Sequence, residues 1–222
     1  MILVFGSLLN NKLINENNAV NRKSVNTREA VIHGDFDSDE QTIIVKRAAS
    51  VLQQGGVIAY PTEYCFGLGC DPRNITAVQR IITIKQRKAS QGLILLAGNS
   101  DQVSEYSDIN ALSLKSQILE SWPGPVTWTL PARQGVSQWL RGTHPSIAMR
   151  ITAHQLCVQL CLEFGHAIVS TSANRHNEAA LLNAVGVVAE MGDEVDYVLP
   201  ADVGGASKAS QIRDGLSGEI LR

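Results

Sequence analysis

The sequence predicts an α/β protein built on a twisted, open, mixed sheet with helices on both sides. Short apolar runs of strand length alternate with longer segments in which apolar residues recur at helical spacing. The alternation is not a regular βαβ pattern, which favours a mixed sheet over a fully parallel one. With 222 residues, 44% of them hydrophobic, the chain has enough apolar material for a sizeable core.

Composition separates the N-terminal part from the rest. Asparagines crowd residues 1–37 and the apolar periodicity there is weak, so we expect a poorly ordered extension. The folded, catalytic domain is expected to span residues 38–222. It is predicted to begin with a helix in which Ser38 and Gln41 form a capping box and which ends at Gly55.

The other elements are predicted from apolar runs and from the breakers between them. Strands are predicted at 57–59, 93–97, 126–130, 147–151 and 167–169. Helices are predicted at 74–84, 110–121, 154–164 and 181–191. Residues 210–222 are predicted to form a turn followed by a final strand.

Net charge and hydropathy narrow the classes of function. The formal net charge is -2 at pH 7, which gives no overall attraction to nucleic acid. No apolar run approaches the roughly 20 residues of a membrane span. The apolar N-terminus also lacks the basic residues that precede the core of a secretion signal. We therefore expect a cytoplasmic protein that has no membrane partner.

The four cysteines are predicted to be structural. Cys157 and Cys161 are one helical turn apart and lie among leucines, which is typical of small buried residues on a helix. Together with Cys65 and Cys70 they lack the CxxC spacing of a zinc site. We expect no tightly bound metal, and no disulfide in a cytoplasmic protein.

Three polar stretches lie where predicted strands end, and the first follows residues 57–59. Pro61 fixes the direction in which the chain leaves the strand, and Thr62 presents a hydroxyl at the strand tip. Gly67 and Gly69 permit a close approach to the backbone. Taken alone, the stretch also fits an ordinary turn.

The second stretch is Lys85-Gln86-Arg87-Lys88. Three cations this close repel one another unless an anion lies among them. A solvated loop is the common explanation for such a cluster. Its position between a helix and an interior strand is nevertheless typical of ligand sites in α/β sheets. A triphosphate would suit the forked guanidinium of Arg87 and the point charge of Lys85.

The third stretch, Ser170-Thr171-Ser172-Ala173-Asn174, directly follows a predicted strand. Its hydroxyls and amide can bind phosphates and carboxylates, and they are equally good turn and cap formers. A further polar candidate is Arg150, which interrupts an apolar predicted strand. Because an unpaired buried guanidinium is costly, Arg150 needs a partner. The candidates are a substrate carboxylate, Glu63 and Asp71.

Several common catalytic patterns are missing. The sequence has no GxxxxGK[ST], GxGxxG or HExxH motif, and its histidines are scattered. Covalent or metal-dependent hydrolysis is therefore not expected. Chemistry by positioning and charge stabilisation fits the residues better.

Six segments in order resemble the YrdC family, whose bacterial members are threonylcarbamoyl-AMP synthases. The segments are AYPTEYCFGLGCDP, IKQRKASQGLILLA, SWPGPVTWTLPA, SIAMRITAH, AIVSTSAN and SQIRDGLSGEILR. They cover the chain from about residue 40 to its end, and the QGLILLA form is similar to the short bacterial branch. The resemblance implies a twisted open α/β fold with a deep, positively charged cavity.

The resemblance also implies a nucleotidyltransferase reaction. L-threonine, bicarbonate and ATP, the last with Mg2+, would give threonylcarbamoyl-adenylate and pyrophosphate, the first step of the t6A modification of tRNA. The residues implied to bind threonine are Thr62, Arg150 and Ser170. Those implied to bind ATP are Lys85, Arg87, Lys88, Ser146, Ser172, Asn174 and Arg213. Lys85 and Arg87 are the implied catalytic cations.

The chain departs from the family pattern after STSAN. Residues 175–180 replace a Ser-Gly turn, and Ala180 stands where relatives often carry a hydroxyl, which removes one expected nucleotide contact. This departure leaves open a paralogue without synthase activity. The resemblance leaves open a second alternative, a non-catalytic member that binds double-stranded RNA in ribosome assembly, and tRNA is the other candidate RNA partner. The synthase interpretation implies downstream t6A-pathway proteins as partners.

Overall fold

A computed structural model describes residues 37–175 and 178–222. In this part of the chain, eight strands form one sheet in the order β7-β1-β2-β6-β3-β5-β4-β8. β1 pairs parallel with β7, β3 with β5 and β4 with β8, whereas the other four pairings are antiparallel. The predicted mixed α/β sheet is therefore confirmed. The strands are β1 Ile58–Pro61, β2 Phe66–Gly69, β3 Ile94–Ala97, β4 Val126–Pro131, β5 Ser146–Ile151, β6 Ile168–Ser172, β7 Tyr197–Val198 and β8 Gln211–Asp214.

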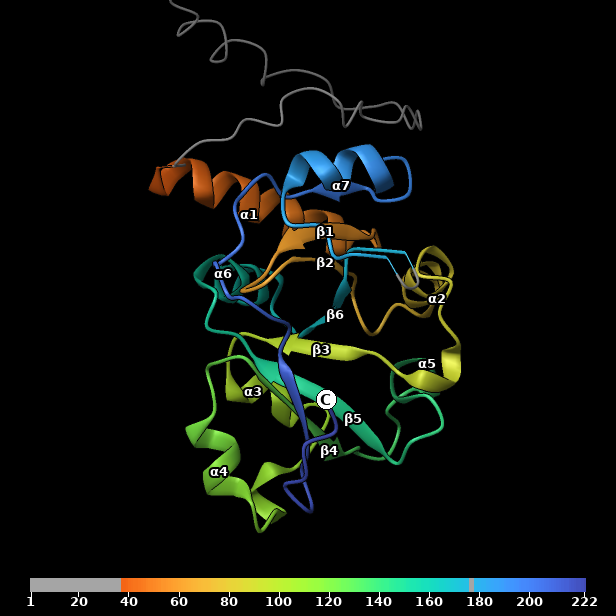
Figure 1. Cartoon of the computed structure of the whole chain (residues 1–222), viewed down its shortest axis with the longest axis vertical. Helices are drawn as coiled ribbons and strands as arrows, with labels where there is room; N and C mark the ends of the chain where they lie inside the picture. Colours follow the sequence, from red (N-terminus) through yellow and green to blue (C-terminus); the bar gives the residue numbers. More distant parts are fainter. Residues whose placement is uncertain (1–36, 176–177) are drawn as a thin grey trace, which may run out of the picture.

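Helices cover both sides of this sheet, as predicted. Figure 1 shows α6 on one side of β6 and α2 on the other, with α1 and α7 over the end formed by β1 and β2. The α-helices are α1 Ser38–Gln53, α2 Ile75–Ile84, α3 Ser100–Ser104, α4 Lys115–Glu120, α5 Gln138–Arg141, α6 Gln155–Phe164 and α7 Ala184–Met191. Two 3-10 turns, η1 Ala89–Gln91 and η2 Ile109–Ala111, complete the set. None of the helices in the described ranges is long and apolar enough to cross a membrane.

The alternation of side chains along the strands divides the apolar residues between two cores. On β3, Leu95 packs into the larger core and Leu96 into the smaller one. The larger core includes residues of α2 and α7, and the smaller core is formed with α1 and α6. Both leucines are fully buried, and each buried leucine contributes about 1.5–3 kcal/mol of transfer free energy. Cys157 and Cys161 lie in the smaller core, which confirms their prediction as buried helix residues.

The capping box of α1 lies one residue earlier than predicted. Asp37, not Ser38, is the N-cap, and its carboxylate accepts from the backbone N–H groups of Asp39 and Glu40, both at 2.9 Å. The Glu40 side chain accepts in return from the Asp37 N–H. A carboxylate at this position also interacts favourably with the positive end of the helix dipole, which explains why it is preferred to the serine.

Two predicted helices are shorter in the structure. The segment 110–121 is split because Leu112 is extended (φ -94, ψ 136) between η2 and α4. The helix predicted at 181–191 begins only at Ala184. Leu181 does not join the helix because its backbone bonds to the sheet. The Leu181 carbonyl accepts from the Phe66 N–H, and the Leu181 N–H donates to the Ala173 carbonyl.

Four strands differ from the prediction: β2 and β7 have no predicted counterpart, β6 continues past residue 169 to Ser172, and β8 is displaced. The C-terminal strand β8 comes before its turn, not after it, and only Ile220 returns to form a single bridge with Arg213. Gly67 and Gly69 lie in β2, which alternation of apolar residues could not reveal. A Cβ on Gly69 would lie 2.7 Å from Cε1 of Tyr60 and 2.9 Å from the Val169 carbonyl. The close approach that these glycines permit is therefore made by the Tyr60 ring.

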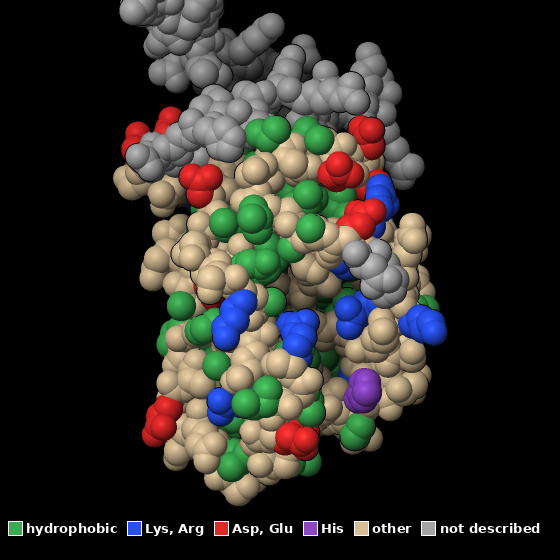
Figure 2. Space-filling model, in the orientation of Figure 1, with side chains coloured by type: hydrophobic (Ala, Val, Ile, Leu, Met, Phe, Trp, Pro, Cys, Tyr) green, Lys and Arg blue, Asp and Glu red, His purple; other side chains and the backbone are tan. Residues whose placement is uncertain are grey.

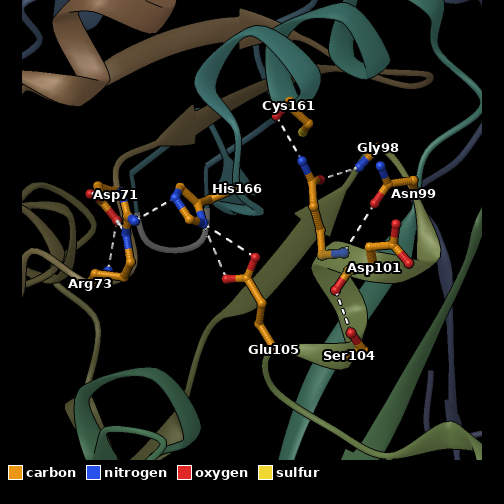
Figure 3. A network of polar contacts seen from close by, with 10 residues as sticks. Asp71, Arg73, Gly98, Asn99, Asp101, Ser104, Glu105, Cys161 and His166 are labelled. Carbon is orange, nitrogen blue, oxygen red and sulfur yellow. Dashed lines mark hydrogen bonds and ion pairs between the residues drawn. The ribbon is translucent and has the colours of Figure 1, made fainter.

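Polar contacts join the loop after β2, the loop before β6 and the end of α3. Figure 3 shows Arg73 between Asp71 and His166, and His166 between Arg73 and Glu105. The Arg73 guanidinium lies 2.5 Å from His166 Nε2. Because a guanidinium can only donate, this contact makes Nε2 an acceptor, so His166 Nδ1–H donates to Glu105 at 3.2 Å. None of these residues lines the cavity described next.

Candidate active site

A cavity of about 470 Å3 opens where helices leave part of one sheet face uncovered. This is the face of the smaller core, on which Leu96 and Ile168 pack with α1 and α6. Two residues along each strand, the same face presents Ile94 and Ser170, which line the cavity. The sheet thus changes from apolar to polar side chains at the edge of its helical cover, and this change creates a site large enough for a small molecule.

Cations outnumber carboxylates in the cavity wall. Its charged side chains are Arg87, Arg141, Arg150, Lys208 and Arg222 against Glu63 and Asp214. Figure 2 shows Lys and Arg side chains gathered around the hollowed middle of the same view, with Asp and Glu mainly above and below. Such a wall favours an anionic ligand, because cations held by the fold need no reorganisation to meet negative charge.

Arg150 and Glu63 form a buried ion pair in this wall. Arg150 Nη1 lies 2.7 Å from Glu63 Oε2, and the two side chains are 8% and 15% exposed. Of the partners considered from sequence, Glu63 is the one that the structure supplies. Burial raises the pKa of Glu63, but the Arg150 charge and the hydrogen bonds that the carboxylate accepts outweigh burial, and the pKa lies below its ordinary value. Glu63 is therefore ionised at neutral pH.

The ion pair leaves part of Arg150 unmatched. Its Nε is buried and has no hydrogen-bond partner among the described residues. Glu63 engages Nη1, so the part of the guanidinium that lines the cavity stays available to a ligand carboxylate. The substrate-carboxylate role predicted for Arg150 is thus compatible with its bond to Glu63.

Thr62 and Ser170 are buried side chains that line the same cavity. The Thr62 hydroxyl donates to the Cys65 carbonyl at 2.7 Å, a contact that closes the turn between β1 and β2. Its hydrogen is therefore used, and the oxygen presents lone pairs that can accept from a ligand. The structure brings the three predicted threonine ligands, Thr62, Arg150 and Ser170, to one wall.

Lys85 lies behind the wall rather than in it. Its Nζ donates to the carbonyls of Ser172 (2.7 Å) and Asn174 (2.6 Å) and to the Asn174 side chain. Burial, and then the neighbouring charge of Arg87, lower the pKa of Lys85 to about 8. The ammonium thus holds the segment 172–174 in place. Ser172 lines the cavity, and its hydroxyl donates to Asn174 Oδ1 at 2.7 Å.

The remaining predicted ATP ligands divide into two groups. Arg87 and Ser146 line the cavity. Burial, and then the charge of Arg222, lower the pKa of Arg87, so two guanidiniums are close enough to repel each other. Lys88 is exposed at the start of η1 and does not line the cavity. Arg213 lies on the other face of β8, with its guanidinium 5.8 Å from the centre of the Trp128 ring.

Sequence reasoning missed several wall residues. Arg141, His144, Lys208, Ser210 and Arg222 all line the cavity. The period-two alternation of β8 was an available signal, because it sends Ile212 and Asp214 to the cavity and Arg213 away from it. The positions of Arg141 and Arg222 depend on packing between distant segments, which no local pattern reveals.

Of the segment that departs from the family pattern, residues 176 and 177 lie outside the described residues. Arg175 pairs with Glu194 at 2.5 Å, and the Glu178 carbonyl accepts from the Asn174 amide at 2.6 Å. Ala180 is not among the residues of the cavity wall.

This protein has a mixed α/β sheet and a cation-lined cavity on the part of one sheet face that the helices leave uncovered. The fold and the cavity define a class of protein that binds a small anionic ligand. The comparison with protein families is more specific. The model of the Sua5/YciO/YrdC family, described as "Telomere recombination", matches residues 50–222. The chain therefore belongs to this family, as its six motifs indicated.

Relatives and solved structures agree with the family. The chain is 46% identical over 178 residues to a threonylcarbamoyl-AMP synthase of Nitrosococcus oceani, a match that covers 80% of this chain and 96% of the relative. It is 39% identical over 184 residues to the Coxiella burnetii protein of the same name, covering 83% and 99%.

Two solved structures show the same fold. Sua5 of P. abyssi complexed with L-threonine superposes with a TM-score of 0.69 at 26% identity, covering 77% of this chain and 50% of that one. The chain thus spans about half of the Sua5 length. YciO of E. coli gives a TM-score of 0.73 at 21% identity, covering 82% and 90%.

Proposed function

We propose that this chain is a threonylcarbamoyl-AMP synthase, a nucleotidyltransferase that uses L-threonine, bicarbonate and ATP. The observation that carries the proposal is the extent of the cavity. Ser146 and Arg150 both line it, four residues apart on β5, which corresponds to roughly 13 Å at the rise of a strand. This length accommodates an amino acid beside a nucleotide.

The side chains near Arg150 suit a free amino acid. Its carboxylate is attracted to the Arg150 guanidinium, while Thr62 Oγ1, whose hydrogen is already donated to Cys65, accepts from the amine. An amine held by an acceptor keeps its nucleophilic lone pair available once a proton is lost. Nitrogen then bonds to the carbon of bicarbonate, water leaves, and a carbamate forms.

Charge stabilisation accounts for the second step. A carbamate oxygen attacks the α-phosphorus of ATP, and the bond from that phosphorus to the bridging oxygen of pyrophosphate breaks. No protein nucleophile is needed. Arg87, Arg141 and Arg222 of the wall would meet the charge on the phosphates. Lys85 contributes indirectly, by holding the segment that presents Ser172.

Mg2+ is proposed to enter with ATP. Among residues 37–175 and 178–222 there is no group of three or more His, Cys, Asp or Glu side chains placed to hold a metal ion. Of the wall carboxylates, Glu63 is paired with Arg150 and Asp214 accepts from the backbone of Leu216 and Ser217. The residues therefore fit an ion held by phosphate oxygens, where it would neutralise part of their charge.

The wider setting follows from this chemistry. We place the enzyme in the cytoplasm, with t6A-pathway proteins as the consumers of its reactive product. Binding of tRNA or double-stranded RNA by this chain remains a prediction. The charged wall described above surrounds about 470 Å3, a volume typical of small-molecule sites and far too small for a duplex.

Omission of single substrates tests the proposal. Pyrophosphate release from ATP is expected only when L-threonine and bicarbonate are both present. Controls use D-threonine and carbonate-free buffer. Release at the same rate without threonine would refute the synthase. Salt-sensitive binding of duplex RNA with no turnover would favour the non-catalytic alternative.

A further inference from the structure

Glu63 is held from three directions at the rim of the cavity. Its Oε2 pairs with Arg150 Nη1 at 2.7 Å. Its Oε1 accepts from the Thr152 hydroxyl at 2.8 Å and from the Ala153 N–H at 3.1 Å. Thr152 is fully buried directly after β5. The carboxylate therefore links the turn after β1 to the two residues that follow the strand carrying Arg150.

A third segment fixes the backbone of the same turn. The Ala206 N–H donates to the Glu63 carbonyl at 2.8 Å and the Gly204 N–H to the Thr62 carbonyl at 2.9 Å. A Cβ on Gly204 would lie 3.1 Å from Glu63 Cα, so this segment lies directly against the turn. Glu63 has little freedom to leave its place when a ligand binds.

We propose that Glu63 is a positioning residue for amino-acid binding and that Thr152 acts through it. The carboxylate pairs with Nη1 of Arg150 and so holds the guanidinium at one place in the cavity wall, while the buried Nε keeps no protein partner among the described residues. A guanidinium held in place can form the paired hydrogen bonds that a carboxylate prefers. Thr152 and Ala153 keep the Glu63 carboxylate in the orientation that this requires.

The inference rests on the proposed function, because it takes L-threonine as the ligand. It adds that the affinity for threonine depends on two residues, of which Thr152 is outside the cavity wall. It also predicts selectivity: a displaced guanidinium weakens the binding of the amino acid and leaves the binding of ATP unchanged.

Calorimetric titration of the full chain with L-threonine tests the inference without turnover. Thr152→Val keeps the shape and removes the hydroxyl, so the Kd for threonine should rise about fivefold, the loss expected for one hydrogen bond. Thr152→Ser should restore it. Glu63→Gln, which removes the charge, should raise the Kd by about tenfold or more. The Kd for ATP should change less than about twofold in each case.

Glu105→Gln is the matched control, because Glu105 pairs with His166 on the surface and neither residue lines the cavity. It should bind both ligands as the unmodified chain does. Thermal unfolding of every variant identifies any that fails to fold. If Thr152→Val fails to fold, Thr152→Ser still tests the inference, because the serine variant must bind threonine with full affinity.

The outcomes separate the two proposals. Threonine affinity that is unchanged in both Thr152→Val and Glu63→Gln would overturn the positioning role alone. Equal weakening of threonine and ATP would overturn it too, since that pattern indicates general loosening of the cavity. An unmodified chain that binds no L-threonine would refute the synthase proposal and this inference with it.

Discussion

Arg150 is a buried cation beside the cavity, and the protein supplies hydrogen-bonding partners for only part of its guanidinium. Glu63 neutralises it, which lowers the cost of burying the charge. The part of its guanidinium that lines the cavity can still bind a carboxylate. Structural pairing and ligand binding are therefore not exclusive roles for this residue, although from sequence they looked like alternatives.

Arg150→Ala should raise the KM for threonine by about tenfold or more, with the KM for ATP changed by less than about twofold. The variant loses the carboxylate partner and leaves the Glu63 charge uncompensated, which also repels the substrate carboxylate. Steady-state pyrophosphate release measures both constants. Arg73→Ala, a residue outside the cavity wall, is the control. An unaltered threonine KM in Arg150→Ala would show that the carboxylate binds elsewhere.

The lowered pKa of Lys85 predicts an unusual pH dependence of the free energy of unfolding and of the KM for ATP. Its pKa of about 8 lies below the ordinary 10.5, so between these values the unfolded chain binds a proton that the folded chain lacks. The contribution of Lys85 to the free energy of unfolding therefore rises with pH in this window. Loss of the ammonium should at the same time weaken its hold on residues 172–174 and raise the KM for ATP above pH 8.

The measurement is the KM for ATP and the urea midpoint from pH 7 to 10, compared with Lys85→Met. The variant should have a high KM for ATP at every pH and should lose the rise of the midpoint between about pH 8 and 10. If the unmodified chain and the variant follow parallel curves, Lys85 does not titrate in this range.

Glu63 gives a slope of the same sign in the acid range, because its pKa is also lowered on folding. Its pKa lies below the ordinary 4.5, so its ionised form stabilises the folded chain above that value, and the contribution is lost as the pH falls through the folded pKa. Glu63→Gln should therefore unfold at a lower urea concentration than the unmodified chain at pH 6. The difference should shrink toward pH 3, and a constant difference would contradict the assignment.

At the scale of elements, two loops lock together to place the cations of the wall. The Leu93 N–H donates to the Leu140 carbonyl at 2.7 Å and the Thr143 N–H to the Ser90 carbonyl at 3.2 Å. Gly92 and Gly142 both have φ +64, and a Cβ on Gly92 would lie 3.0 Å from the Arg141 carbonyl. Only glycine allows these two backbones to lie so close. Arg87 and Arg141 are carried by the segments that they join.

Gly142→Ala should therefore lower the free energy of unfolding more than Gly135→Ala does. Its Cβ would collide with the Ser90 carbonyl, whereas Gly135, at φ +90, has nothing within 4 Å. Gly135→Ala should cost about 1 kcal/mol, the penalty of the left-handed backbone alone, and Gly142→Ala about 2–4 kcal/mol with a raised KM for ATP. Urea unfolding and kinetics of both variants decide, and equal costs would show that the contact between the loops relaxes.

At the scale of the whole molecule, two cores on opposite faces support one cavity. The larger core extends along the sheet, while the smaller one covers only part of its face. The uncovered part is where the site lies. A site on the strands of a sheet that is packed from behind is held more rigidly than one built on loops alone.

Leu95→Ala and Leu96→Ala probe the two cores from adjacent positions of β3. Both side chains are fully buried, one in each core, and each variant should lose about 2–5 kcal/mol of the free energy of unfolding. Neither residue lines the cavity, so the KM values should stay within about twofold. Urea unfolding gives the cost. A large change in threonine KM for only one variant would mean that its core shapes the site.

The sequence by itself determined the class of fold, the family and most elements, because these depend on local periodicity, on breakers and on motifs that remain recognisable in order. It also singled out Thr62 after a strand, Arg150 within one, and Ser170 and Ser172, which the structure makes residues of β6; all four line the cavity. What tertiary structure decided was which side chains share the cavity. It turned Arg213 away, placed Lys85 behind Ser172, and brought in Arg141 and Arg222, because a contact between distant segments depends on how the sheet pairs and which face its helices leave open.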